Sequence, residues 1–186
     1  MACLGVLVAA AAGLVPPGAG TRTLMASASG PVPARTGGFA EMTCLQCHWD
    51  NPINDPAGRI GLTGVPDTYA PGERYPITVT IAHPELVNGG FQMSARFEDG
   101  TNAGAFRSPD ERSEPVSDDG GRITYIQHTS PGSLTAAKGQ SRWDVEWTAP
   151  AAGGAVVLHL AGNAANGDLS PLGDYIFTTT ATTRSR

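Results

Sequence analysis

Residues 75–82 have the sequence YPITVTIA, in which apolar and polar side chains alternate. A period of two is that of a β-strand, whose successive side chains point to opposite faces. It places four apolar side chains on one face of the strand: Tyr75, Ile77, Val79 and Ile81. Residues 91–97, FQMSARF, repeat the alternation. Because a strand that is apolar on one face must bury that face, both segments predict a sandwich of two sheets.

Five further short segments have strand character, and turn residues separate them. They are residues 59–63, 122–129, 141–148, 155–161 and 174–180. The chain has 24 glycines and 15 prolines, and such punctuation between apolar segments is typical of an all-β chain. We therefore predict an antiparallel β-sandwich over residues 58–181. Its predicted core includes Tyr75, Ile77, Val79, Phe91, Phe97, Trp143, Val145 and Trp147.

The charge of the chain argues against nucleic acid as a partner. Its 12 basic and 17 acidic residues give a net charge of −5 over 186 residues. A surface that binds nucleic acid needs a basic patch or stripe, which this composition does not favour. A charged partner is therefore expected to be basic. The length suits one domain with its own core.

The first residues predict that the protein is exported. Residues 1–15 are apolar and uncharged, and Ala26-Ser27-Ala28 matches the small-residue pattern of a signal-peptide cleavage site. We therefore predict a signal peptide over residues 1–28. The alternative is that this segment is retained as a membrane anchor. Residues 29–57 follow as a linker, rich at its start in Gly, Pro and small residues, that also carries a cysteine motif.

The motif Cys44-Leu45-Gln46-Cys47-His48 is that of covalent c-type haem attachment. In such sites two thiols add to the vinyl groups of the haem, and the histidine binds the iron. We predict one haem c, attached through Cys44 and Cys47, with His48 as an iron ligand. The alternatives are a redox disulfide and half of a zinc site. The first is expected in a βαβ context and the second needs another ligand pair, and the sequence offers neither.

His128 is the predicted second axial ligand. It lies near the end of the segment 122–129, just before the turn Ser130-Pro131-Gly132, where a haem docked on the sandwich would meet it. By the period of two, His128 is on the face opposite Ile123 and Tyr125, so it points outward if that pair faces the core. A surface histidine in a turn is the alternative interpretation. The other candidate ligands are His83, His159 and Met93.

Several segments carry a family resemblance. They are residues 69–75 (YAPGERY), 90–95 (GFQMSA), 125–130 (YIQHTS), 147–150 (WTAP), 161–168 (AGNAANGD) and 173–175 (GDY). Over residues 36–180 the chain resembles the bacterial choice-of-anchor V family, a relative of the reelin-type (Reeler) β-sandwich domains. The resemblance implies a secreted immunoglobulin-like sandwich. Its Tyr-x-x-His-Thr segment corresponds to Tyr125, His128 and Thr129, which favours His128 as the ligand.

The segment 163–174 has two interpretations. Its side chains offer oxygen ligands for calcium, although their spacing matches no EF-hand. Consecutive turns in which Asx side chains bond backbone amides explain the same residues, and this interpretation is favoured. The residues concerned are Asn163, Asn166, Asp168 and Asp174.

Three classes of function follow from these observations. The first is a single-haem electron-transfer protein, alone or within a larger membrane-associated or extracellular complex, with a redox partner protein. The second is a surface or extracellular-matrix binding module with a structural haem or none. The third is an enzyme or sensor with an open haem position. No Ser/His/Asp or Cys/His arrangement for nucleophilic catalysis is evident, so an electron carrier is the favoured interpretation.

Overall fold

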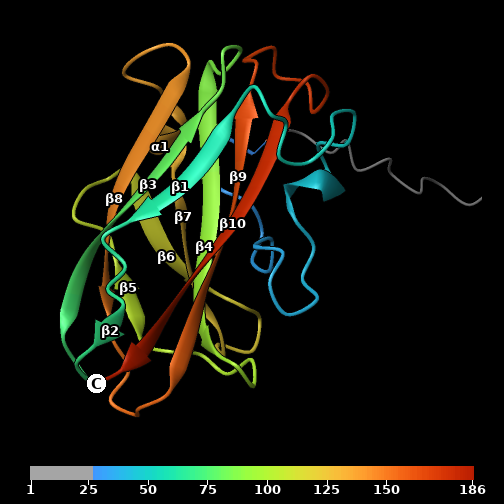
Figure 1. Ribbon diagram of the computed structural model, residues 1–186. Helices are drawn as coiled ribbons and strands as arrows, with labels where there is room; N and C mark the ends of the chain where they lie inside the picture. Colours follow the sequence, from blue (N-terminus) through green and yellow to red (C-terminus); the bar gives the residue numbers. More distant parts are fainter. Residues whose placement is uncertain (1–26) are drawn as a thin grey trace, which may run out of the picture.

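The computed structural model describes residues 27–186, which form two β-sheets packed face to face (Figure 1). This confirms the predicted antiparallel β-sandwich. The predicted signal peptide falls almost entirely outside the described residues. Within residues 27–186, no helix is both long and apolar enough to cross a membrane.

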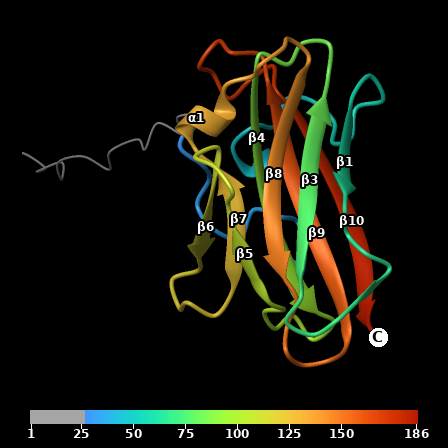
Figure 2. The ribbon, with the colours of Figure 1, turned by 90° about the vertical axis from the view of Figure 1, so that its left-hand side faces the viewer.

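The smaller sheet has four strands, and all its pairs are antiparallel. Their order is β1 (Arg59–Thr63), β3 (Arg74–Ala82), β8 (Gln140–Thr148) and β5 (Ala105–Arg107). The larger sheet has six strands and lies behind the first, as the turned view in Figure 2 shows. Their order is β2 (Thr68–Tyr69), β10 (Tyr175–Ser185), β9 (Ala155–Ala165), β4 (Asn88–Phe97), β7 (Thr124–His128) and β6 (Ser113–Ser117).

Pairing in the larger sheet is antiparallel except between β10 and β2, which run parallel. Two short helices complete the described chain: the 3-10 turn η1 (Cys44–Gln46) and α1 (Ser130–Ser133). All the segments predicted as strands are found, as β1, β3, β4, β7, β8, β9 and β10. The strands β2 and β5 were missed because two or three residues are too few for a period to show, and β6, with the sequence SEPVS, was missed because it has no alternating apolar residues.

The core lies between the sheets, where the apolar faces of β3, β8, β4 and β9 meet. Val79 is paired with Trp143 across β3 and β8, and Trp143 packs on Phe91 of the other sheet with ring centroids 4.8 Å apart. Each buried indole donates to a carbonyl, Trp143 to Gly132 and Trp147 to Ala103. The predicted core is confirmed, with Tyr75 and Phe97 partly buried at its margin.

The outer face of the larger sheet is covered by residues 30–48, which Figure 1 shows in blue and cyan beside β9 and β10. Gln92 of β4 accepts from the Arg35 amide at 2.7 Å, and Arg96 pairs with Glu41. The composition of this segment predicted a linker. The segment is instead fixed on the sheet by polar contacts, which a count of apolar residues does not reveal.

Candidate functional site

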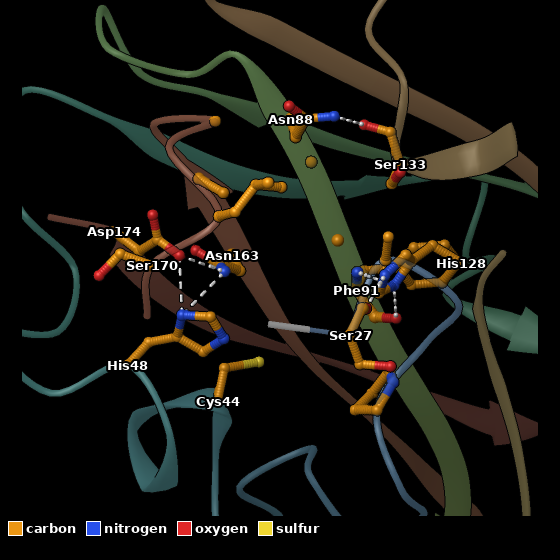
Figure 3. A pocket seen from close by; sticks show the side chains of 17 residues that line it. Ser27, Cys44, His48, Asn88, Phe91, His128, Ser133, Asn163, Ser170 and Asp174 are labelled. Carbon is orange, nitrogen blue, oxygen red and sulfur yellow. Dashed lines mark hydrogen bonds and ion pairs between the residues drawn. The ribbon is translucent and has the colours of Figure 1, made fainter. Parts of the chain in front are cut away.

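One cleft lies at the end of the larger sheet where β4 and β10 begin and β7 and β9 end (Figure 3). It holds about 780 Å³ of space, part of it open to solvent. Its lining consists mainly of small and apolar residues. These residues are Ser27, Ala28, Pro31, Cys44, His48, Asn88, Gly89, Gly90, Phe91, His128, Ser133, Asn163, Ala165, Gly167, Leu169, Ser170 and Asp174.

The cleft brings together three of the four predicted site residues, Cys44, His48 and His128. Figure 3 shows the Cys44 sulfur beside the His48 ring on one side of the cleft, with His128 on the other side. Cys47 is not among the lining residues. A second iron ligand would have to lie across the cleft from the motif, which is where His128 lies.

The cysteine motif forms a tight turn. Thr43 caps η1 through its side-chain oxygen, which accepts from the Leu45 amide, and the amides of Cys47 and His48 both donate to the Cys44 carbonyl. Both cysteines are free thiols and half-buried. Desolvation raises the pKa of the Cys44 thiol to about 12, so the thiol stays protonated at neutral pH. A reactive redox cysteine needs the opposite shift, because the thiolate is the nucleophile.

His48 is oriented by a buried carboxylate. Its Nδ1 lies 2.7 Å from Oδ2 of Asp174, whose side chain is 1% exposed. A carboxylate only accepts, so Nδ1 carries the proton of the neutral ring and Nε2 is left with a free lone pair. Nε2 has no hydrogen-bond partner among the described residues. Histidines that bind metals commonly have this arrangement, in which the second nitrogen donates to a carboxylate.

Asp174 is itself held by the turns of the segment 163–174. The Asn166 amide donates to Oδ1 at 3.0 Å, and Asn163 Nδ2 donates to Oδ2 at 3.1 Å. The preceding turns use Asx oxygens in the same way, as in the bond from the Ser170 amide to Asp168. These bonds are the predicted turn network. Residues 27–186 contain no group of three or more His, Cys, Asp and Glu placed to hold a metal ion by themselves.

His128 ends the pairing of β4 with β7. Its Nδ1 accepts from the Phe91 amide at 3.0 Å and lies 3.2 Å from the Phe91 carbonyl oxygen, while Nε2 lies 3.3 Å from the Ser27 carbonyl oxygen. Burial lowers the pKa of His128, which favours the neutral ring that binding to a metal requires.

The ring of His128 occupies a space that only a glycine leaves open. A Cβ atom on Gly90 would lie 2.8 Å from Cε1 of the ring, on the side of β4 away from Phe91. The prediction that His128 points outward assumed that Tyr125 faces the core. This assumption is wrong. Ile126 belongs to the core, and the Tyr125 hydroxyl donates to Glu41 on the outer face. His128 reaches the cleft because β7 ends there.

The other candidate ligands lie away from the cleft. Met93 is fully buried in the core. His83 is stacked on Tyr175 with ring centroids 3.8 Å apart, and His159 packs against Phe39. Asp174 is the partner of the motif that the sequence did not reveal, since its pattern indicated only a turn residue or a calcium ligand.

The fold and the cleft define a class: an antiparallel β-sandwich with a cysteine and two histidines at one end of its larger sheet. No protein-family model and no curated protein matches the chain. Similar solved structures include the reelin-N domain of F-spondin, at 25% identity over 70% of this chain and 86% of that chain, with a TM-score of 0.47.

Two further solved structures are similar. Fragment 2 of the human F-spondin reeler domain has 23% identity over 74% of this chain and 96% of that chain, with a TM-score of 0.46. A cohesin module from a Clostridium perfringens family 33 glycoside hydrolase has 12% identity over 70% and 97%, with a TM-score of 0.48. Likeness at this level carries no conclusion about family or activity.

Proposed function

We propose that the chain is an exported protein that carries one covalently attached c-type haem in the cleft and transfers electrons to a redox partner protein. The observation that carries this proposal is the position of His48. His48 lines the same cleft as Cys44 and His128, and its Nδ1 is paired with Asp174, which leaves Nε2 for a ligand. A signal peptide fits the proposal, because c-type haem is attached outside the cytoplasm.

The residues of the cleft fit this group in their chemistry. Cys44 and Cys47 would hold it through thioether bonds, and His48 would bind the iron through Nε2. The lining of the cleft includes small residues such as Gly89, Gly90 and Ala165. When bound, a haem supplies a one-electron iron couple, and the protein supplies ligation, burial and charge.

His128 is the residue that would supply a second ligand to the iron. For Nε2 to bind iron, Nδ1 must carry the proton and donate to the Phe91 carbonyl at 3.2 Å, so the bond that Nδ1 accepts from the Phe91 amide would be given up. The described partner of Nε2 is the Ser27 carbonyl. Cleavage after Ala28, where the sequence predicts it, removes that partner and leaves Nε2 free in the cleft.

A binding module without haem is the second candidate function. Apolar side chains on segments next to the cleft are exposed, with Leu169 90% and Trp49 55% exposed, and Leu134, Leu172 and Val87 are also exposed. Exposed apolar groups that gather at one end of a protein mark interaction sites. In this alternative the cleft takes part in docking a protein or glycan.

One experiment separates the two candidates. The full chain is produced in a bacterial host that matures c-type cytochromes, and the exported protein is denatured and weighed by mass spectrometry. A mass increase of one haem supports the proposed function, whereas a bare polypeptide refutes it and favours the binding module. The variant Cys44→Ala/Cys47→Ala is the control and is expected to carry no covalent haem.

A further inference from the structure

We infer that Asp174 is a positioning residue for the haem iron: it fixes the proton of His48 on Nδ1 and lowers the reduction potential through its charge. This inference rests on the proposed function, since it concerns the ligand that would hold the iron. Asp174 lines the cleft but would not bind the iron itself. It acts through the His48 ring.

The two polar neighbours of His48 Nδ1 make opposite demands on the ring. The Asp174 carboxylate accepts only, so it requires a proton on Nδ1. The Asn163 amide nitrogen donates only, and a bond from it to Nδ1 would move the proton to Nε2 and block ligation. The carboxylate is the nearer, at 2.7 Å against 3.4 Å, and Asn163 donates to Asp174 Oδ2 at 3.1 Å. Asp174 therefore decides the tautomer.

The pair is locked by contacts on both sides. Asn51, three residues after His48, donates from its side chain to the Asp174 carbonyl oxygen at 3.1 Å. The Gly173 amide donates to Asp50 Oδ2 at 2.6 Å. The segment that follows the haem motif and the turn that carries Asp174 are thus joined at successive residues, and His48 and Asp174 keep their distance.

The position of the charge predicts the sign of its effect. A negative charge one ring away from the iron favours the ferric state, which carries one more positive charge than the ferrous state. The His48 side chain is 12% exposed and that of Asp174 1%, so water screens the interaction weakly. Removal of the charge is therefore expected to raise the reduction potential.

The test compares Asp174→Asn with Asp168→Asn in the haem-loaded full chain. Both variants remove one carboxylate from the same turn segment, but Asp168 is exposed and bonds only Asn166 and Ser170. At a fixed solution potential, Asp174→Asn should raise the ferrous-to-ferric ratio about tenfold, equal to about 59 mV for a one-electron couple. Asp168→Asn should leave the ratio near that of the wild type. Equal ratios in the two variants overturn the inference and leave the proposed function standing.

A second measurement covers the case in which Asp174→Asn does not load haem. In unloaded wild-type protein with ¹⁵N-labelled histidine, long-range ¹H–¹⁵N spectra distinguish the two tautomers, and His48→Gln identifies the signal. Nδ1–H at His48 supports the inference, and Nε2–H overturns it. A wild-type protein that carries no haem in the mass measurement refutes the proposed function separately.

Discussion

The backbone of Phe91 and the side chain of His128 take the place of a strand-to-strand pair. The Phe91 amide donates to His128 Nδ1 at 3.0 Å, and the Phe91 carbonyl oxygen lies 3.2 Å from the same nitrogen. In either neutral tautomer Nδ1 meets one of the two backbone groups that a further residue of β7 would otherwise meet: unprotonated it accepts from the amide, and protonated it donates to the carbonyl. One ring therefore both ends the sheet and presents its other nitrogen to the cleft.

His128→Ala tests the second ligand. We expect the loaded wild-type protein to have a low-spin, six-coordinate haem, and the variant to become high-spin or to bind a new ligand. Absorption and electron paramagnetic resonance spectra measure the change. An unchanged low-spin spectrum would show that another group occupies the position, and His83→Ala is the matched control because His83 lies outside the cleft.

Gly90→Ala should displace the His128 ring. A Cβ atom 2.8 Å from Cε1 forces the ring or the strand to move, and overpacking of this kind costs about 1 to 3 kcal/mol of unfolding free energy. Chemical denaturation of the unloaded protein gives the value. Gly61→Ala in β1 is the control, since the nearest atom to its Cβ is Thr80 Oγ1 at 3.3 Å. The same loss in both variants would argue against a specific clash.

His128 should make the stability of the unloaded protein depend on pH. Burial places its folded pKa below the unfolded value of 6.5, so below about pH 6.5 the unfolded chain binds a proton that the folded chain does not. The free energy of unfolding should therefore decrease as the pH is lowered below about 6.5, by at most about 1.36 kcal/mol per pH unit from this group. His159 acts in the same direction.

The contribution of His128 is isolated by denaturation curves of wild type and His128→Gln between pH 5 and 7. The unfolding free energy of wild type relative to His128→Gln should fall as the pH is lowered below about 6.5, and the difference should become constant toward pH 7. A difference that does not vary with pH would contradict the assignment.

Arg96→Met should loosen the segment that carries the haem motif. Arg96 pairs with Glu41, and both side chains are buried. Removal of one partner leaves a buried charge, which costs about 3 to 5 kcal/mol. Hydrogen exchange should show faster exchange over residues 36–48. The control Arg142→Met breaks an exposed pair with Asp144. It should change neither the free energy of unfolding nor the exchange rate of residues 36–48 appreciably.

Trp147→Ala should be among the most damaging core substitutions. The ring is fully buried, packs edge-to-face on Tyr69, and donates to the Ala103 carbonyl. Truncation of a core aromatic costs about 3 to 5 kcal/mol, measurable by chemical denaturation. Trp49→Ala is the control because that side chain is 55% exposed. A small loss at Trp147 would contradict its place in the core.

The fold was predictable because its long strands alternate cleanly. In β3 and β8 every second residue is apolar, and these residues form the core. The parallel strand β2 was not predictable, since two residues carry no period. Residues 30–48 were predicted as part of a linker because the start of this segment is rich in Gly, Pro and small residues. Their order comes from Glu41 and from bonds to Gln92, which depend on the finished sheet.

The candidate site was partly predictable because one part of it is a local sequence motif. The cysteine motif is local, so Cys44, Cys47 and His48 stand out in the sequence. The choice of His128 came from its place at a strand end and from the family resemblance. The approach of Asp174 to His48 depends on how two distant segments pack, and no local pattern joins them.

The chain that bears His48 is fastened before and after the motif. Glu41 joins it to Arg96 on one side, and Asp50 accepts the Gly173 amide on the other. In an electron carrier, a ligand held in this way keeps its place when the iron gains or loses charge. Little of the surroundings then has to reorganise, which speeds the exchange of electrons with a partner.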